Sequence, residues 1–468
     1  MESLNNIELE EIQINQLDSL IDFTALHCVN PKRYPFILES SAQAEDILAD
    51  KVHSAESHAR YSILFCFPQE TLTLYSDNQL EGAVVDSEKD FLSNLDSQWL
   101  NNKTAFKNTE FPFIGGWFVY LSYEFAAQIE PRLKLPMPEH KSVIARLTRI
   151  PAAIIHDKNT NKQFIVIENS HSEKFNKIFD DIEKISVEKF CHSDVNVEIK
   201  EELEDVYLNS IKKVKEYIKE GDVFQVNLSR LWKARDINGI NTLCLYHALK
   251  KSNPAPFSAY VNYDECKIIS SSPERLVKVK DGRVQTRPIA GTRARKNETK
   301  EDIENLKELI AHPKERAEHV MLIDLERNDL GRICKPGSIH VDELMVLESF
   351  KHVHHIVSNV AGSLRENITP GNIIHAVFPG GTITGCPKER CMQIIAELEA
   401  APRGAYTGSV GYINRDGSMD LNILIRTFEL SNNQLSLRAG AGLVADSVAS
   451  KELDETRAKA KGLLKALH

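Results

Sequence analysis

The sequence predicts a mixed α+β protein built on antiparallel sheets. Short β-rich runs recur through the first 170 residues, and strands and helices alternate irregularly after residue 200. A doubly wound parallel sheet needs a regular strand–helix order, which this chain lacks. With 468 residues, 42% of them hydrophobic and 26% charged, the chain can bury a large core without disulfides.

Individual elements follow from local patterns. The N-terminal strands are predicted at 61–67 (YSILFCF), 71–76 (TLTLYS), 115–125 (GGWFVYLSYEF) and 163–168 (QFIVIE). An amphipathic helix is predicted over 203–219 and ends at Gly221. A long charged helix is predicted over about 298–328, and a C-terminal helix over about 449–467.

The best domain boundary is the charged stretch at about 170–200, which looks like a helix followed by a loose connection. We therefore expect an N-terminal region of residues 1–195 packed on a second region of residues 196–468, which contains the motifs that could carry chemistry.

Charge and cysteine content narrow the classes of function. The net charge of −10 and pI of about 5.9 disfavour a nucleic-acid surface. A negative protein that binds an anionic metabolite must build a local positive site. The eight cysteines form no CxxC pair, which disfavours a zinc knuckle. With a polar, acidic N-terminus and no apolar run of 18 residues, we expect a cytoplasmic protein with no signal peptide and no membrane span.

Four segments of the second half could carry chemistry, although each alone is weak. TRPIAGTRAR (286–295) could be a solvated basic loop. ERAEHVMLIDLERNDLGRI (315–333) predicts a helix with two acids in its first turns, ended by the RND segment, for which capping the helix and pairing internally are the two expected roles. FPGGTITGCPKER (378–390) predicts a glycine-rich loop with Pro387 at a helix start. RAGAGLVADS (438–447) predicts a strand that runs into a tight glycine turn and is not a dinucleotide fingerprint.

Taken together and in order, the motifs resemble those of chorismate-utilising enzymes, which include anthranilate synthase, aminodeoxychorismate synthase, isochorismate synthase and salicylate synthase. The matching segments are GDVFQVNLSR (221–230), SSPERL (271–276), PIAGTR (288–293), EHVMLIDLERNDL (318–330), HHIVS (354–358), PGGTITGCPK (379–388), GSVGY (408–412), IRT (425–427), AGAGLVADS (439–447) and DETRAKA (454–460). The resemblance implies an anthranilate-synthase-like sandwich of antiparallel sheets with helices outside, around a deep central site.

The resemblance also assigns residues. It implies that Glu318 and Glu455 hold Mg²⁺, which suits a hard cation that also takes the substrate carboxylate. Tyr412 and Arg426 are expected to grip the enolpyruvyl carboxylate, for which arginine offers a bidentate fork. Backbone groups near Gly440 and Gly442, with Thr382 and Lys459, would complete the anion pocket.

For the chemistry, Glu274 resembles the general acid that protonates the leaving ring hydroxyl. His355 resembles the family histidine beside that hydroxyl, and Thr382 is counted with them. Gln225 stands where water-adding members carry a lysine. Because glutamine cannot act as a base, the resemblance favours ammonia as the nucleophile.

Two features divide the aminating members. Ala290 matches anthranilate synthases, whereas enteric aminodeoxychorismate synthases have a lysine there that can attack the ring covalently. The PGGTITG loop (379–385) resembles the aminodeoxychorismate branch. We expect aminodeoxychorismate synthase component I, which serves 4-aminobenzoate and folate synthesis. Anthranilate synthase component I is the alternative.

The resemblance further implies partners. The chain shows no glutamine-hydrolysing module, so ammonia is expected from a separate glutamine amidotransferase subunit. The FILESS (36–41) and NPAPF (253–257) segments resemble a tryptophan pocket, for which Glu39, Ser40, Asn253 and Pro254 are the candidate residues. A regulatory subunit that binds chorismate or tryptophan without catalysis is a rival from another class. The presence of Glu274, Glu318 and Glu455 argues against it.

Overall fold

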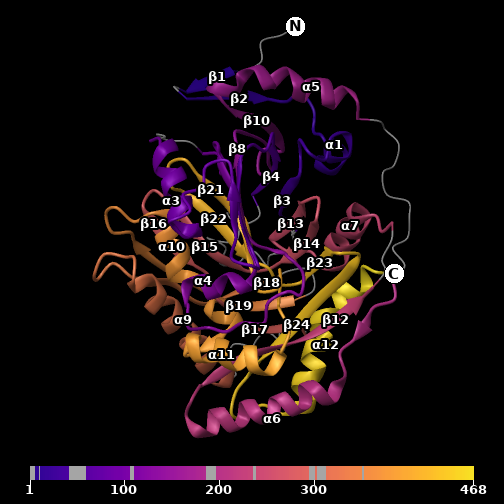
Figure 1. Cartoon of the computed structure of the whole chain (residues 1–468), viewed down its shortest axis with the longest axis vertical. Coiled ribbons are helices and arrows are strands. Elements are labelled where there is room, and N and C mark those ends of the chain that lie inside the picture. Colours follow the sequence, from indigo (N-terminus) through magenta and orange to yellow (C-terminus); the bar gives the residue numbers. More distant parts are fainter. Residues whose placement is uncertain are drawn as a thin grey trace.

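Two large antiparallel sheets form the framework of the computed structural model (Figure 1). The structure describes residues 6–9, 11–41, 60–105, 110–185, 197–235, 239–294, 301–302, 313–349 and 353–468. Within these residues, every strand pairing is antiparallel. The predicted α+β class with antiparallel sheets is therefore confirmed.

The first sheet has 13 strands among the described residues. Their spatial order is β1 (Asn6–Leu9), β2 (Ile12–Gln16), β10 (Lys162–Glu168), β9 (Ala152–Asp157), β4 (Tyr61–Cys66), β3 (Phe36–Glu39), β13 (Phe257–Asn262), β14 (Cys266–Ser272), β23 (Thr427–Ser431), β24 (Gln434–Leu443), β12 (Gln225–Ala234) and β11 (Lys200–Glu201), with β20 (Gly385–Cys386) beside β12.

The second sheet has 11 strands in the same described part of the chain. Their order is β17 (Ile289–Ala294), β19 (Val353–Ser363), β16 (Arg283–Thr286), β15 (Arg275–Lys280), β22 (Met419–Ile423), β21 (Ser409–Asn414), β7 (Gly116–Leu121), β8 (Val143–Ile150), β5 (Thr71–Tyr75) and β6 (Leu80–Gly82), with β18 (His340–Ser349) beside β19.

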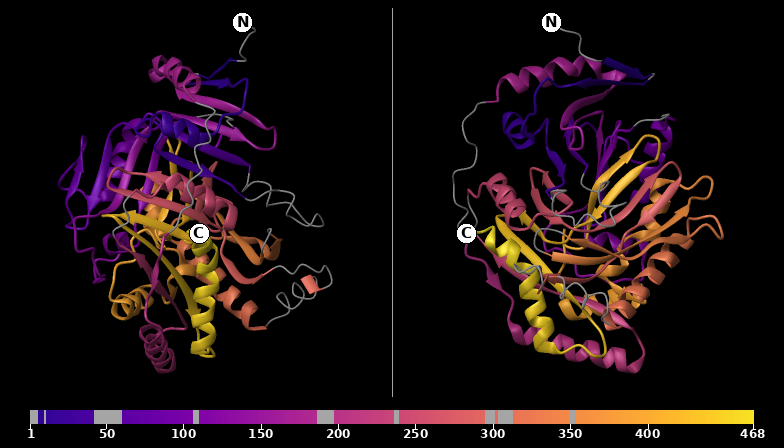
Figure 2. Two further views of the ribbon diagram at one scale, coloured as in Figure 1. Left: turned by 90° about the vertical axis from the view of Figure 1, so that its right-hand side faces the viewer. Right: turned by 180° about the vertical axis from the view of Figure 1, so that it is seen from behind.

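Helices cover the outer faces and edges of the sheets (Figures 1 and 2). They are α1 (Phe23–Val29), α3 (Phe91–Asn102), α4 (Ala126–Ile129), α5 (Phe175–Glu183), α6 (Glu204–Glu220), α7 (Thr242–Ser252), α9 (Pro313–Gly331), α10 (Pro370–Val377), α11 (Lys388–Glu399) and α12 (Ala449–Lys465), with 3₁₀ turns η2 (Tyr123–Phe125), η3 (Asn169–Lys174) and η4 (Gly381–Ile383). None of the helices in the described residues combines the length and hydropathy that a membrane span needs.

Strands from both sides of residue 195 share each sheet. β3 pairs with β13 in the first sheet, and β7 pairs with β21 in the second. The sheets also contact each other through this mixed region, where the Phe36 and Phe118 rings stack with centroids 4.2 Å apart. The division at residue 195 stays a prediction, and residues 186–196 lie outside the described part of the chain.

Two local predictions concern helix ends. α6 ends as predicted, because Gly221 adopts φ +86°, a left-handed conformation that glycine reaches at little cost. The RND segment lies in the last turn of α9, which ends at Gly331, two residues after Asp329. Of the two roles expected for the segment, pairing is found and not capping, because Asp329 is buried and pairs with Lys388.

The glycine segment near residue 440 also differs from its prediction. Gly440 and Gly442 lie inside β24, paired with Ser229 and Asn227 of β12, and not in a tight turn. The strand tolerates them because neighbouring side chains occupy the space that their own side chains would need.

Candidate active site

Two chain crossings between the sheets position the candidate general acid and the candidate anion-binding arginine. Glu274 lies where the chain passes from β14 of the first sheet to β15 of the second. Arg426 lies where it returns from β22 to β23. Backbone hydrogen bonds clamp both crossings, from Ile423 N to Glu274 O at 3.0 Å and from Ser271 N to Arg426 O at 3.1 Å. The two side chains are therefore held by the fold's framework.

Glu274 is a buried carboxyl with the properties of a proton donor. It is 4% exposed, and burial raises its pKa to about 8, with a further increase from the charge of Glu326. The Thr382 hydroxyl and the Lys459 charge oppose that increase. Among the described residues, Glu274 Oε1 and Thr382 Oγ1 have no hydrogen-bond partner. Buried polar atoms are normally paired, so both atoms are suited to a ligand.

Arg426 supplies positive charge inside the site. It adopts φ +53°, an uncommon conformation for a residue other than glycine and one that clusters at functional sites. Its Nη1 donates to Asn253 Oδ1 at 3.0 Å, and within the described residues no carboxylate pairs with it. Burial lowers its pKa, while Tyr406 acts in the opposite direction. A buried guanidinium of this kind is expected to bind an anion.

His355 faces the same region from β19 of the second sheet. It is 4% exposed, and burial, together with the positive charge of Arg426, lowers its pKa to about 3. The imidazole is therefore neutral at physiological pH, and it can donate or accept a hydrogen bond without adding charge beside a leaving group.

Gly440 and Gly442 form a floor under three polar side chains. A Cβ atom at Gly442 would lie 2.3 Å from Gln225 Nε2. One at Gly440 would lie 2.7 Å from Asn227 Oδ1 and 2.8 Å from the Tyr406 hydroxyl. In addition, β23 pairs with β24 only as far as Leu437, so it does not cover the strand edge at the two glycines. The Tyr406 hydroxyl and the side-chain amides of Gln225 and Asn227 therefore lie against the part of β24 that carries the two glycines.

Helix α12 packs on β24 (Figure 2). Lys459 Nζ donates to Gly440 O at 2.9 Å and forms an ion pair with Glu455 at 2.8 Å. Electrostatic contacts link Lys459 to Glu274 and Arg426 to His355, and the side chains of Gln225 and Lys459 lie against β24. That these residues act together on a substrate stays a prediction.

Known proteins match this chain over most of its length. The family model for chorismate binding enzymes matches residues 36–465. The chain belongs to the chorismate-binding enzyme family. It is thus an enzyme that acts on chorismate, which is a dianion and accounts for a positive site inside an acidic protein.

Relatives from two aminating branches resemble it. Anthranilate synthase component 1 of Aquifex aeolicus is 43% identical, over 76% of this chain and 74% of the relative. Aminodeoxychorismate synthase component 1 of Bacillus subtilis is 39% identical, over 79% of this chain and 80% of the relative. The crystal structure of anthranilate synthase component I from Streptococcus pneumoniae gives a TM-score of 0.78 at 29% identity, covering 90% of this chain and 94% of the other.

The proposed metal ligands of this family member lie on two helices. Glu318 is on α9, which packs on β17 and β19, and Glu455 is on α12. Within the described residues, no three potential ligands form a ready-made metal cluster. Two carboxylates nevertheless fit Mg²⁺, because this ion keeps several waters and accepts substrate oxygens. The donor set is thus compatible with a metal that binds together with chorismate.

Tyr412 does not join this site, contrary to the prediction. Its ring packs against Phe65 and Phe113, with centroids 6.2 and 5.7 Å away. Strand alternation is the physical reason, because successive side chains of β21 point to opposite faces. Tyr406, in the loop before β21, supplies the hydroxyl that sits over Gly440.

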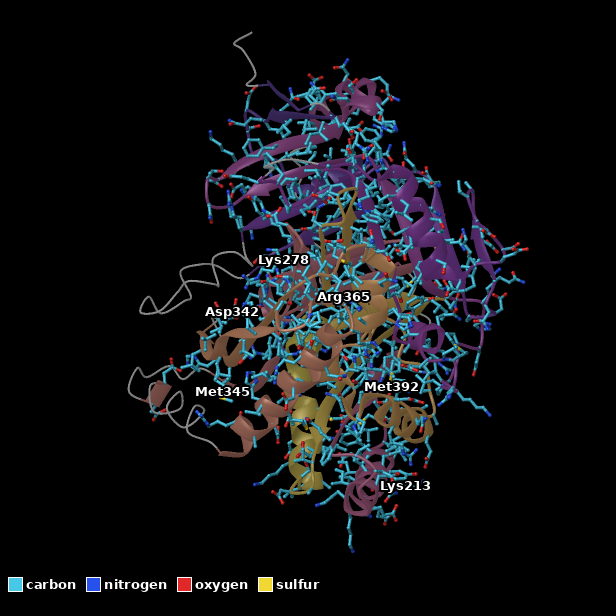
Figure 3. All side chains as sticks on the ribbon, turned by 90° about the vertical axis from the view of Figure 1, so that its left-hand side faces the viewer. Lys213, Lys278, Asp342, Met345, Arg365 and Met392 are labelled. Carbon is cyan, nitrogen blue, oxygen red and sulfur yellow. The ribbon has the colours of Figure 1, made fainter. Side chains whose placement is uncertain are left out.

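Tyr412 instead lines a separate pocket of about 800 Å³, called here the Tyr412 pocket. Its wall includes Glu39, Arg275 and Lys278, and Lys278 is labelled in Figure 3. Glu39 accepts hydrogen bonds from Tyr246 at 2.8 Å and Lys250 at 2.6 Å.

The other tryptophan-pocket candidates are not in the described wall of the Tyr412 pocket. Ser40 is buried, and its carbonyl accepts a hydrogen bond from Lys158. Asn253 accepts a hydrogen bond from Arg426 and donates one to the Ser271 carbonyl, in the candidate active site. Pro254 follows Asn253 after α7. Of the four residues, only Glu39 reaches the pocket.

Ala290 lies on β17, opposite Ile356 of β19 and next to the register position of His355. Its side chain lies outside the part of the structure that is described.

The sequence analysis missed four polar residues that the fold brings to the site. Tyr406 and Asn227 lie over Gly440, and Glu326 and Thr286 lie behind Glu274. Glu326 belongs to the matching segment 318–330, in which only Glu318 was given a role at the site. Asn227 follows Gln225 by two residues in the matching segment 221–230, so the alternation of a strand there could have indicated it.

Proposed function

We propose that this chain is aminodeoxychorismate synthase component I, which joins ammonia to the chorismate ring to give 4-amino-4-deoxychorismate. The observation that carries amination is Gln225, which is 8% exposed and lies over Gly442. An amide cannot deprotonate water, whereas ammonia needs no base to become a nucleophile. An aminating site therefore needs only to position the two reactants and protonate the leaving group.

The polar groups of the candidate active site have separate roles in the proposed reaction. Arg426, with Tyr406 and the backbone at Gly440, binds a carboxylate of chorismate. Glu318 and Glu455 would hold Mg²⁺, which neutralises carboxylate charge and fixes the ring when bound. Lys459 ties α12 to β24 and adds positive charge beside Glu274.

Glu274 gives its proton to the ring hydroxyl, which leaves as water while the C–N bond forms. Ammonia contributes the nitrogen and loses one proton, so chorismate and ammonia yield the amino compound and water. His355, being neutral, can hydrogen-bond the departing hydroxyl, and the Thr382 hydroxyl can orient the acid. General acid catalysis of this type contributes about 10²–10⁴-fold.

The position of amination is the finer part of the proposal. The PGGTITG loop (379–385) carries Thr382 beside Glu274 and supports the 4-amino product. Ala290 and the 43% identity with an anthranilate synthase favour a second candidate, anthranilate synthase component I. That enzyme would also eliminate pyruvate from the same ring.

We expect the ammonia to come from a glutamine amidotransferase subunit. A second pocket of about 750 Å³, the Phe224 pocket, supports this expectation. It is lined in part by Phe224 and Val320, which are 69% and 50% exposed, and by Met392. Figure 3 shows Met392 well apart from Lys278 of the Tyr412 pocket, so the two pockets are separate. Large exposed apolar side chains around a hollow are typical of a protein-binding surface.

We further propose tryptophan as a ligand of the Tyr412 pocket. The aromatic rings of Tyr61, Phe257 and Tyr412 and the charged side chains of Lys278 and Arg60 line it. This lining suits an amino acid with an aromatic side chain and a carboxylate.

Product analysis with chorismate, Mg²⁺ and ammonium at alkaline pH tests the proposal. An amino compound that becomes 4-aminobenzoate only after a lyase is added is the expected result. Fluorescent anthranilate, formed with pyruvate and without a lyase, would establish the second candidate instead.

A further inference from the structure

The reaction described above does not use Glu326, a buried carboxyl on α9. Glu326 is 7% exposed and lies one helical turn before Asp329, which is 1% exposed. Residues three apart on a helix share a face, so the two carboxyls are neighbours. Lys388, on the neighbouring helix α11, pairs with Asp329 at 2.5 Å. In the described part of the chain, that pair leaves Glu326 without an ion pair of its own.

Glu326 lies between the Phe224 pocket and the acid Glu274. Asp329 and Lys388 line the Phe224 pocket. On the inner side, a Cβ atom at Gly381 would lie 3.4 Å from Glu326 Oε1, so η4 passes directly against this carboxyl. Its charge also raises the pKa of Glu274. Buried polar groups thus form a continuous series from the surface pocket to the reacting centre.

A buried hydroxyl beside Glu326 lacks a partner. Thr286 is 1% exposed, and within the described residues its Oγ1 makes no hydrogen bond. It lies near enough to Glu326 to lower the pKa of that carboxyl, as does the backbone N–H of Gly381, but Oγ1 makes no hydrogen bond of normal geometry in the described structure. Thr382 Oγ1, next to Gly381, also lacks a partner. Because buried hydroxyls are normally paired, a small hydrogen-bonding ligand fits here.

We propose that Glu326 binds the ammonium ion on its way from the Phe224 pocket to chorismate and removes one proton from it. The inference rests on the proposed amination. The carboxylate and NH₄⁺ give a carboxylic acid and NH₃, and no oxidant or reductant is involved. The nitrogen lone pair freed in this step forms the C–N bond, and the proton returns to solvent through the Phe224 pocket.

The environment of Glu326 suits such an exchange. Burial, with the neighbouring charge of Asp329, raises the pKa of Glu326 well above that of a free carboxyl, while Lys388 opposes the increase. A raised pKa makes the carboxylate a better proton acceptor, as this step requires. The charged groups that face it are Asp329 from its own helix, Lys388 from α11 and Glu274 from the β14–β15 crossing.

The Glu326→Gln variant of the full chain tests the inference. The rate of chorismate consumption is measured over a range of ammonium chloride concentrations at constant ionic strength. We expect the KM for ammonium to rise about tenfold or more, and the KM for chorismate to stay within about twofold. Glu326→Asp keeps the charge but retracts it, and should give an intermediate ammonium KM. Glu397→Gln removes an exposed acid from α11 and should change neither constant.

An unchanged ammonium KM in Glu326→Gln, or a lower kcat with the ammonium KM unchanged, would overturn the inference. If thermal melting shows that this variant does not fold, Glu326→Asp decides the question, because an unchanged ammonium KM there overturns it equally. A wild-type chain that consumes no chorismate with ammonium contradicts the proposed function itself, and the inference then falls with it. Wild-type activity with an insensitive Glu326 contradicts the inference alone.

Discussion

The side-chain amide of Gln225 lies directly over Gly442, so that a Cβ atom at position 442 would meet Nε2 at 2.3 Å. The contact joins β12 to β24 at the candidate active site. It explains why β24 carries glycine in the middle of a strand, where glycine has little intrinsic preference. The two glycines and the polar side chains above them act as one unit, from which the first prediction follows.

Gly442→Ala should impair activity more than stability. The added methyl meets the flexible end of Gln225, which can move away, so the unfolding free energy should change by less than about 1 kcal/mol. Gly440→Ala meets the backbone oxygen of Leu228 at 2.9 Å as well as Tyr406, and should cost about 1–3 kcal/mol. Urea unfolding of both variants, with chorismate kinetics, checks this. Equal stability losses would contradict it.

Gln225→Lys should weaken amination and allow water to add to the ring. The resemblance places a lysine here in water-adding enzymes, and burial at 8% exposure would favour its neutral, basic form. Chromatography of the products should show isochorismate and at least a tenfold lower yield of the amino compound. Gln225→Met, similar in length but unable to act as a base, is the control and should form no isochorismate.

Glu274→Gln should lower kcat by about 10²–10⁴ while changing the KM for chorismate little, because the variant loses the proton donor but keeps the shape. In the wild type, kcat should fall above about pH 8 as Glu274 loses its proton, since burial raises its pKa to about 8. A kcat that stays constant to pH 9.5 would exclude Glu274 as the acid.

Glu274→Gln, which should lower kcat, should also stabilise the folded protein at neutral and alkaline pH. Burial raises the pKa of Glu274 from 4.5 in the unfolded chain to about 8 in the folded one. Its contribution to stability is therefore fully present below pH 4.5 and is lost as pH rises to about 8. Relative to the wild type, Glu274→Gln should gain stability between pH 5 and 9. Denaturation curves of the variant and the wild type at pH 5 and pH 9 measure this. If the difference in unfolding free energy between the two proteins is the same at both pH values, the pKa of Glu274 is not raised.

Arg426→Lys should raise the KM for chorismate about 10- to 100-fold, because lysine cannot form the bidentate contact that arginine offers a carboxylate. Thermal melting should show a folded protein, since in the described residues Arg426 pairs with no carboxylate. An unchanged KM would show that the guanidinium does not bind substrate.

The two tyrosines should separate two ligands. Tyr406→Phe removes the hydroxyl over Gly440 and should raise the KM for chorismate. Tyr412→Ala opens the Tyr412 pocket and should weaken tryptophan binding, measured by calorimetry, with little effect on that KM. The reverse pattern would return Tyr412 to the active site and contradict its packing against Phe65 and Phe113.

Much of the fold and most of the site could be predicted from sequence because the motifs are local. Glu274, His355, Gln225, Arg426 and Lys459 each lie in a short recognisable segment. The failures concern orientation and distance along the chain. Tyr406 and Tyr412 are six residues apart, but Tyr406 lies in the loop before β21 and Tyr412 within the strand, so the course of the loop decides that Tyr406 is the tyrosine over Gly440.

The positions of buried charged residues could not be predicted from local sequence either. The RND segment was expected to cap its helix or to pair internally, and only the structure shows that Asp329 is buried and pairs with Lys388, on a helix that begins 59 residues later. That pairing is a tertiary contact, which no local sequence pattern predicts. The same holds for Asn253, which resembled part of a tryptophan pocket and instead holds Arg426.

Ring amination is the central claim. Its most direct test is to incubate the purified chain with chorismate, Mg²⁺ and ¹⁵N-labelled ammonium and to measure the mass of the product by mass spectrometry. The account predicts an amino derivative whose mass is one unit higher than that formed with unlabelled ammonium. A product without nitrogen, such as a hydroxylated isomer of chorismate formed by addition of water, would contradict it.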